Sequence, residues 1–270
     1  MLQRVKLKTA FYFGADAVYV GLKKFSARAS AMNFDGEELK EAVKYCHTYG
    51  VKVHVTLNTL VYENEYGELF ESLKQICEAG ADAMLVVTPY YNKATQNGLY
   101  EHFKAMADVA TCPVILYNVP SRTGCNLKPE TVLRLSEHPM IVGIKEASGD
   151  LSQVATLAAL CGDKIDIYSG NDDQILPILS LGGKGVISVL SNLLPGQTDA
   201  ICKKFFDGDL EGAKDLQLKY LPLIHLLFCE VNPIPVKAAM KLIGYDCGDC
   251  RLPLAGLSKE NMAKIEAFFK

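Results

Sequence analysis

Short apolar runs rich in β-branched residues recur along the chain, and stretches with the apolar spacing of a helix lie between them. The pattern predicts seven strands, at 16–21, 51–58, 83–89, 113–119, 140–146, 165–170 and 185–191. It also predicts intervening helices, among them 35–50, 65–80, 98–110 and 129–138. Strands that alternate with helices and are apolar on both faces indicate a parallel sheet covered by helices, as in a (β/α) barrel or a doubly wound sheet.

After Asn192 the pattern becomes purely helical. Helices are predicted at 194–207, 209–228, 233–243 and 258–269. Because no Gly/Ser/Pro-rich linker divides the chain, we expect one domain over 1–270, with barrel strands up to 192 and a helical C-terminal extension at 193–270. The favoured fold class is an α/β barrel with seven recognisable strands. The first strand is apparently missing, since a predicted helix at 3–14 opens the chain.

Composition narrows the classes of function. The net charge of −3 argues against a nucleic-acid partner, which would require a basic surface. No apolar run approaches the roughly 18 residues of a membrane-spanning helix, so we expect no membrane partner. The nine cysteines are scattered, which is typical of reduced thiols in a cytoplasmic protein. The only close pair, Cys247 and Cys250, is weak as a metal site, and we predict neither a metal ion nor a cofactor.

Polar residues gather where the predicted strands end. They lie in the segments 88–92, 117–124, 145–150, 169–173 and 188–192. In a (β/α) barrel the carboxyl ends of all strands meet at one face, where working residues are found. These segments are therefore expected to converge on one site.

Lys145 lies in the apolar strand "IVGIKE", where a charged ammonium group would be costly to desolvate. At its ordinary pKa of about 10.4, roughly one amine in a few thousand is neutral at pH 7. Burial lowers that pKa and makes the amine a nucleophile that can attack a ketone and form a Schiff base. The alternative is a structural ion pair, most simply with Glu146.

Three further residues favour the catalytic interpretation of Lys145. Tyr117 follows an apolar run and could transfer a proton to and from the attacked carbonyl, although most buried tyrosines only pack. Arg122 lies in the loop "VPSRTG", and its planar guanidinium suits a carboxylate, although a solvated loop arginine is equally plausible. Gly170 ends a strand and would let backbone approach a ligand closely.

Several long motifs resemble the dihydrodipicolinate synthase family from about residue 80 to the C-terminus. They are "VVTPYYNKATQNGLYEHFKAMAD", "CPVILYNVPSRTGCNL", "IVGIKEASGDLSQV", "IYSGNDDQILPILSLGGKGVISVLSN" and "NPIPVKAAM". The resemblance implies a TIM-type barrel and a lyase that condenses pyruvate with L-aspartate 4-semialdehyde through a lysine Schiff base, in diaminopimelate and lysine biosynthesis. It also implies a homo-oligomer, either a dimer or a tetramer. The sister enzyme N-acetylneuraminate lyase, which uses the same lysine and tyrosine, is an alternative.

The same resemblance assigns roles to residues. It implies that Lys145 is the Schiff-base lysine, Tyr117 the proton-relay tyrosine and Tyr91 a second relay tyrosine that reaches into a neighbouring subunit. Arg122 resembles the arginine that receives the semialdehyde carboxylate. Gly170 and Ile187 match positions that line the pyruvate site through backbone groups.

The first 80 residues depart from that family. Leu22 and Lys23 fall near the place of the loop threonines, one of which connects the two relay tyrosines. The pattern "LKTAFYFGADAVYVGLKKFSARA" instead resembles the collagenase-like peptidase family, which suggests a chimera of two barrel genes. The lost threonine predicts impaired turnover or a non-catalytic barrel. Arg28 and Asn58 fall at predicted strand ends, where they could face the site or lie in surface loops.

Overall fold

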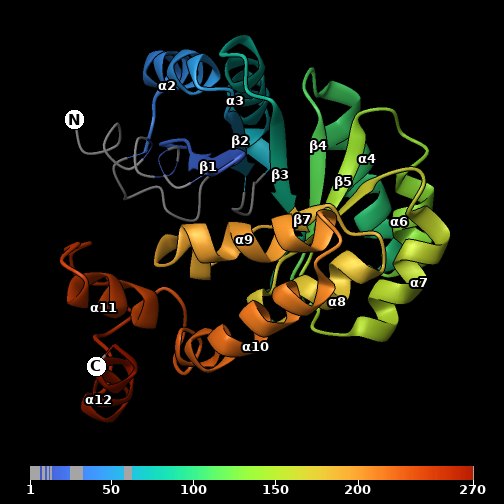
Figure 1. Cartoon of the computed structure of the whole chain (residues 1–270). Coiled ribbons are helices and arrows are strands. Elements are labelled where there is room, and N and C mark those ends of the chain that lie inside the picture. Colours follow the sequence, from blue (N-terminus) through green and yellow to red (C-terminus); the bar gives the residue numbers. More distant parts are fainter. Residues whose placement is uncertain are drawn as a thin grey trace. The chain divides into compact units, whose positions relative to one another are not determined.

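The computed structural model describes residues 7, 10, 12, 14–24, 33–57 and 63–269. Within them seven strands follow one another in the sheet in chain order (Figure 1). The strands are β1 (Ala17–Gly21), β2 (Lys52–Leu57), β3 (Ala83–Val87), β4 (Val114–Asn118), β5 (Ile141–Glu146), β6 (Asp166–Ser169) and β7 (Gly185–Val186). The pairs from β1 to β5 are parallel. The fold is therefore of the predicted (β/α) TIM-barrel type.

The helices between these strands also follow the predicted alternation. They are α2 (Gly36–Thr48), α3 (Tyr66–Glu78), α4 (Gln96–Val109), α6 (Pro129–Leu135) and α7 (Leu151–Cys161), with short pieces η1 (Glu63–Glu65) and α5 (Pro120–Thr123). α2 begins with a capping box in which Asp35 accepts from the Glu38 N–H while Glu38 accepts from the Asp35 N–H. The buried stripe of α2 includes Leu39, Val43 and Cys46, as its apolar period predicts.

By contacts the chain divides into two compact units. The first comprises 1–168 with 181–184, and the second comprises 169–180 with 185–270. On the interior face of the first unit, Ala83, Leu85 and Ile115 form a buried cluster against which Tyr19 and Tyr117 pack. Residues between these positions, such as Met84 and Leu116, are buried on the opposite face. Both faces of the central strands are therefore covered, which explains their continuous apolar sequence.

The second unit is mainly helical, as predicted for the C-terminal extension. It contains η2 (Asp172–Gln174), α8 (Ile175–Ser180), η3 (Leu190–Asn192), α9 (Pro195–Phe206), α10 (Leu210–Leu226), α11 (Ile234–Leu242) and α12 (Lys259–Phe268). Its core joins η3 and the long helices through Leu190, Leu223, Val236 and Ile265, among others. No helix in the described parts of the chain is long and apolar enough to cross a membrane.

Strand β7 is shorter than the predicted run 185–191. After Val186 the backbone leaves the strand, and the N–H groups of Val189 and Leu190 donate to the carboxylate of Asp172 at 2.9 and 2.8 Å. This buried side chain thus holds the start of η3, a connection that an apolar pattern does not reveal. The predicted helix 3–14 lies largely outside the described residues, as do Arg28 and Asn58.

Candidate active site

Lys145 and Tyr117 lie side by side near the carboxyl ends of β5 and β4. The parallel register pairs the two residues directly. The Nζ atom of Lys145 is 4.4 Å from the centre of the Tyr117 ring. Both side chains are half-buried, so the amine and the phenol share a site that is partly shielded from water. The amine of Lys145 and the phenol of Tyr117 are thereby brought together.

The neighbouring carboxylate of Glu146 lies on the other face of β5, because successive strand residues point to opposite sides. Glu146 is 1% exposed and accepts hydrogen bonds from Asn118 Nδ2, the Ser148 N–H and Gln153 Nε2. Burial raises the pKa of Glu146, although these hydrogen bonds act against the shift. This arrangement disfavours the simple alternative of a Lys145–Glu146 ion pair.

Glu146 belongs to a buried polar network that sequence reasoning missed. Asn118 Nδ2 donates to Asn126 Oδ1 at 2.8 Å, and Asn118 Oδ1 accepts from the Leu127 N–H at 2.9 Å. Asn126 Nδ2 in turn donates to Gln153 Oε1 at 2.7 Å. The network ties β4 and β5 to the segments that follow them, directly behind Tyr117 and Lys145. In the sequence, only the asparagine in the apolar run "VILYN" indicates that a buried polar network is present here.

Two threonines that sequence reasoning also missed connect the end of β3 to the loop after β4. Thr88 is fully buried, its N–H donates to the Tyr117 carbonyl at 3.0 Å, and its hydroxyl donates to Thr123 Oγ1 at 3.3 Å. The Thr123 hydroxyl also lies 2.9 Å from the Cys125 carbonyl. These contacts fix the backbone on either side of Tyr117.

Tyr91 follows Thr88 in the same loop. Its N–H donates to the Thr123 carbonyl at 3.3 Å, and its backbone adopts a left-handed conformation with φ of 72°. The side chain is 85% exposed. A non-glycine residue in this conformation is uncommon and strained.

Arg122 lies in α5, which Gly124 ends in a left-handed conformation with φ of 68°. Its N–H donates to the Val119 carbonyl at 3.0 Å, and its side chain is exposed. The backbone of Arg122 is therefore held in the turn, while the residue as a whole is exposed.

Gly170 and Ile187 lie in the second unit. Gly170 directly follows β6, and the Ile187 N–H donates to the carbonyl of the preceding residue, Ser169, at 2.8 Å. The structure therefore brings these two predicted residues to neighbouring strand ends. Both are half-buried.

The interior of the first unit also holds polar rings that the sequence did not single out. Tyr19 and His54 pair in register and meet edge to face, with ring centres 4.9 Å apart. Burial raises the pKa of Tyr19, and nearby Tyr168 acts in the same direction. Burial lowers the pKa of His54, whose buried Nδ1 atom has no hydrogen-bond partner among the described residues.

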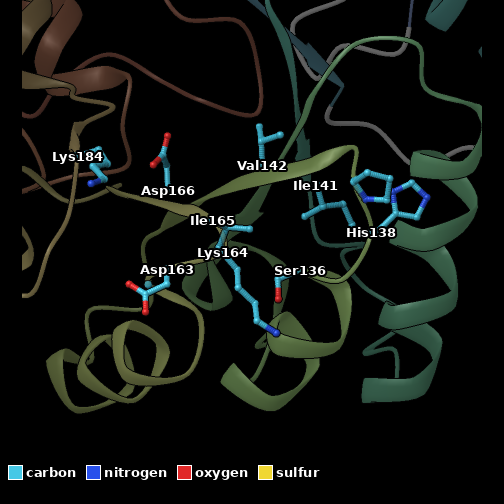
Figure 2. Close-up of a pocket in the computed structure, with 11 residues that line it drawn as sticks. Ser136, His138, Ile141, Val142, Asp163, Lys164, Ile165, Asp166 and Lys184 are labelled. Carbon is cyan, nitrogen blue, oxygen red and sulfur yellow. The ribbon is translucent and has the colours of Figure 1, made fainter.

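A cavity of about 540 Å³ opens at the opposite end of the first unit (Figure 2). Its lining includes Ile141 and Asp166, which begin β5 and β6, together with His138, Lys164 and Lys184. Lys145 lies near the other end of β5, so this cavity is separate from the candidate site. Among the described residues, no three His, Cys, Asp or Glu side chains are placed to hold a metal ion.

Comparison with known proteins gives concordant results. Residues 39–270 match the dihydrodipicolinate synthetase family. The chain is 51% identical over 235 residues to 4-hydroxy-tetrahydrodipicolinate synthase from Clostridium perfringens, covering 87% of this chain and 80% of that protein. It is 59% identical over 188 residues to the protein of that name from Caldicellulosiruptor saccharolyticus, covering 70% of this chain and 63% of that protein. The crystal structure of dihydrodipicolinate synthase from Thermotoga maritima superposes with a TM-score of 0.87 at 34% identity. The superposition covers 99% of this chain and 91% of that one.

Proposed function

The chain belongs to the dihydrodipicolinate synthetase family, and we propose that it condenses pyruvate with L-aspartate 4-semialdehyde through a Schiff base on Lys145. The family is one of carbon–carbon lyases of the Schiff-base aldolase type. The observation that carries the proposal is the pairing of Lys145 with Tyr117, whose ring centre is 4.4 Å from the amine.

The chemistry follows from these two groups. The neutral Lys145 amine adds to the ketone carbon of pyruvate, and loss of water leaves an iminium ion. The positive iminium withdraws electrons, so the adjacent methyl group loses a proton and becomes a carbon nucleophile. That carbon attacks the aldehyde of the second substrate and forms the new carbon–carbon bond. Tyr117 would donate and recover protons at the attacked oxygen atoms.

Binding roles are proposed for three other residues. The exposed guanidinium of Arg122 would pair with the carboxylate of the semialdehyde, since its fork geometry matches two oxygen atoms. Backbone groups at Gly170 and Ile187 would contact pyruvate, which is supported by their places at neighbouring strand ends.

We further propose a cytoplasmic homo-oligomer in which Tyr91 completes the site of a neighbouring subunit. Tyr91 is 85% exposed, as expected for a residue that a second copy covers, and backbone strain such as its φ of 72° occurs at functional sites. The nine free cysteines fit a reducing compartment.

Turnover is proposed to be reduced because the relay threonine has no counterpart at Leu22 or Lys23. Leu22 is buried and forms an isolated parallel β-bridge with Phe34. Lys23 forms ion pairs with Asp35 and Glu38 at 2.7 and 3.1 Å. Neither position offers a hydroxyl group. Because the family match begins at residue 39, a chimeric origin is proposed only for the residues before it, whose likeness to collagenase-like peptidases supports it. Introducing Leu22→Thr together with Lys23→Thr should raise the turnover number, whereas an unchanged value would remove the lost threonine as the cause.

A substrate assay tests the proposed activity. Purified protein is incubated with pyruvate and aspartate semialdehyde, and separately with N-acetylneuraminate, with Lys145→Ala as the inactive control. Consumption of the first pair alone supports the synthase. Cleavage of N-acetylneuraminate alone would favour the sister lyase, and loss of neither substrate would indicate a non-catalytic barrel.

A further inference from the structure

Two cysteines that the proposed chemistry does not use lie in contact within the first unit. Cys77 is in the last turn of α3, and Cys112 is in the turn between α4 and β4. Their Sγ atoms are 3.1 Å apart, although 35 positions separate them in the chain. A disulfide bond is about 2.05 Å long, so the two sulfur atoms need to approach by about 1 Å to be bonded.

The surroundings shift the pKa values of the two thiols in opposite directions. Hydrogen bonding with Cys112, with the Thr111 side chain and with the backbone of 111–112 lowers the pKa of Cys77, although burial opposes the shift. The hydrogen bond with Cys77, together with burial, raises the pKa of Cys112. Cys77 is therefore disposed to be the thiolate, which is the reactive form of cysteine, and Cys112 to retain its proton.

We propose that Cys77 and Cys112 form a disulfide on reaction with a hydroperoxide. The Cys77 sulfur attacks one oxygen of the peroxide, the O–O bond breaks, and a sulfenic acid forms on Cys77. The Cys112 sulfur then attacks the sulfenic sulfur and displaces hydroxide, which leaves as water with the Cys112 proton. With hydrogen peroxide, two thiols and one peroxide give one disulfide and two waters. The peroxide is reduced by the two electrons that the thiols lose.

The position of the pair determines what the bond would do. Cys77 precedes β3 and Cys112 precedes β4, so the bond would form at the amino ends of these strands. Lys145 and Tyr117 lie near the carboxyl ends of β5 and β4. The closed loop would contain β3 and α4 and would restrict the unfolded chain. Oxidation is therefore expected to stabilise the protein without changing the Lys145–Tyr117 site.

Peptide mapping tests the proposal directly. The reduced chain is treated with hydrogen peroxide, the peroxide is removed with catalase, and the chain is then unfolded, alkylated with iodoacetamide and digested without reductant. We expect a peptide containing Cys77 linked to one containing Cys112, and two fewer alkylated thiols than the nine of the reduced chain. The unfolding temperature should rise by about 5–10 °C and return to its original value with dithiothreitol.

Two variants sharpen the test. Cys112→Ala should leave a sulfenic acid on Cys77, detectable with dimedone, and should form no linked peptide. Cys46→Ala is the matched control, because Cys46 is a fully buried thiol whose pKa burial raises to about 11, and it should keep the link. If Cys112→Ala does not fold, the peptide map of the oxidised parent chain decides whether the Cys77–Cys112 disulfide forms. A folded, oxidised chain without the Cys77–Cys112 link, or one linked only in urea, would overturn the proposal.

Discussion

Lys145 Nζ lies 4.4 Å from the centre of the Tyr117 ring, and the parallel register of β4 and β5 pairs the two residues directly. The phenol ring therefore covers one side of the amine, while the buried network of Asn118 and Glu146 supports both strands from the opposite face. In the proposed function, this geometry positions the Lys145 amine as the nucleophile and places the Tyr117 phenol beside it as the proton donor.

The first prediction concerns the Tyr117 hydroxyl. Tyr117→Phe keeps the ring beside Lys145 but removes the proton-transfer group, so the turnover number should fall by about 10² to 10⁴. Steady-state kinetics with pyruvate and aspartate semialdehyde measure this change. Tyr100→Phe is a matched control and should retain full activity, since the Tyr100 ring on α4 lies under Arg134 of α6. A Tyr117→Phe enzyme within a factor of two of the parent would exclude the proton-relay role.

A second prediction concerns the polar network behind the site. Asn118→Ala removes donors and acceptors from the buried Glu146, Asn126 and Leu127 groups, and should lower the free energy of unfolding by about 2–4 kcal/mol. Urea denaturation gives the value. Asn97→Ala, at an exposed position of α4, should change it by less than about 0.5 kcal/mol. Equal effects of the two substitutions would show that the network contributes little.

Apolar periodicity was enough to predict the order of strands and helices, because both faces of each central strand must be buried. The pairing of Tyr117 with Lys145 was also accessible, since both lie near the carboxyl ends of adjacent parallel strands. The Thr88–Thr123 contact was only partly accessible: the segments 88–92 and 117–124 were expected to converge, but which of their side chains meet depends on tertiary packing. The short β7 was missed for the same reason, since Asp172 binds backbone N–H groups 17 and 18 positions away.

His54 leads to a prediction about pH. Its folded pKa is lowered, mainly by burial, while Asp82 acts in the opposite direction and Lys52 in the same one. As the pH falls through the unfolded value of 6.5, the unfolded chain takes up a proton that the folded chain does not. Stability contributed by neutral His54 is thus present above pH 6.5 and is lost as the pH decreases.

His54→Leu should therefore reduce the loss of unfolding free energy between pH 7.5 and 5.5, by at most about 1.4 kcal/mol per pH unit. Urea titrations of both proteins at several pH values measure the slope. Burial also lowers the pKa of His102, so part of the slope should remain in the variant. An identical slope in the two proteins would contradict this assignment.

Arg122 is predicted to act on the second substrate only. Arg122→Leu removes a charge-assisted hydrogen bond worth about 1.5–3 kcal/mol, so KM for aspartate semialdehyde should rise about 10- to 150-fold. KM for pyruvate should change little. Arg134→Leu, which removes a guanidinium stacked on Tyr100, is the matched control. A parallel rise in both KM values would indicate a structural role for Arg122 instead.

Trapping the Schiff base tests the central claim most directly. The folded chain is incubated with pyruvate, reduced with borohydride and analysed as the intact protein and as peptides by mass spectrometry. We predict one reduced pyruvyl adduct per chain, located at Lys145 and absent from Lys145→Ala. An adduct on another lysine, or none on the folded protein, would contradict the assignment of Lys145 as the nucleophile.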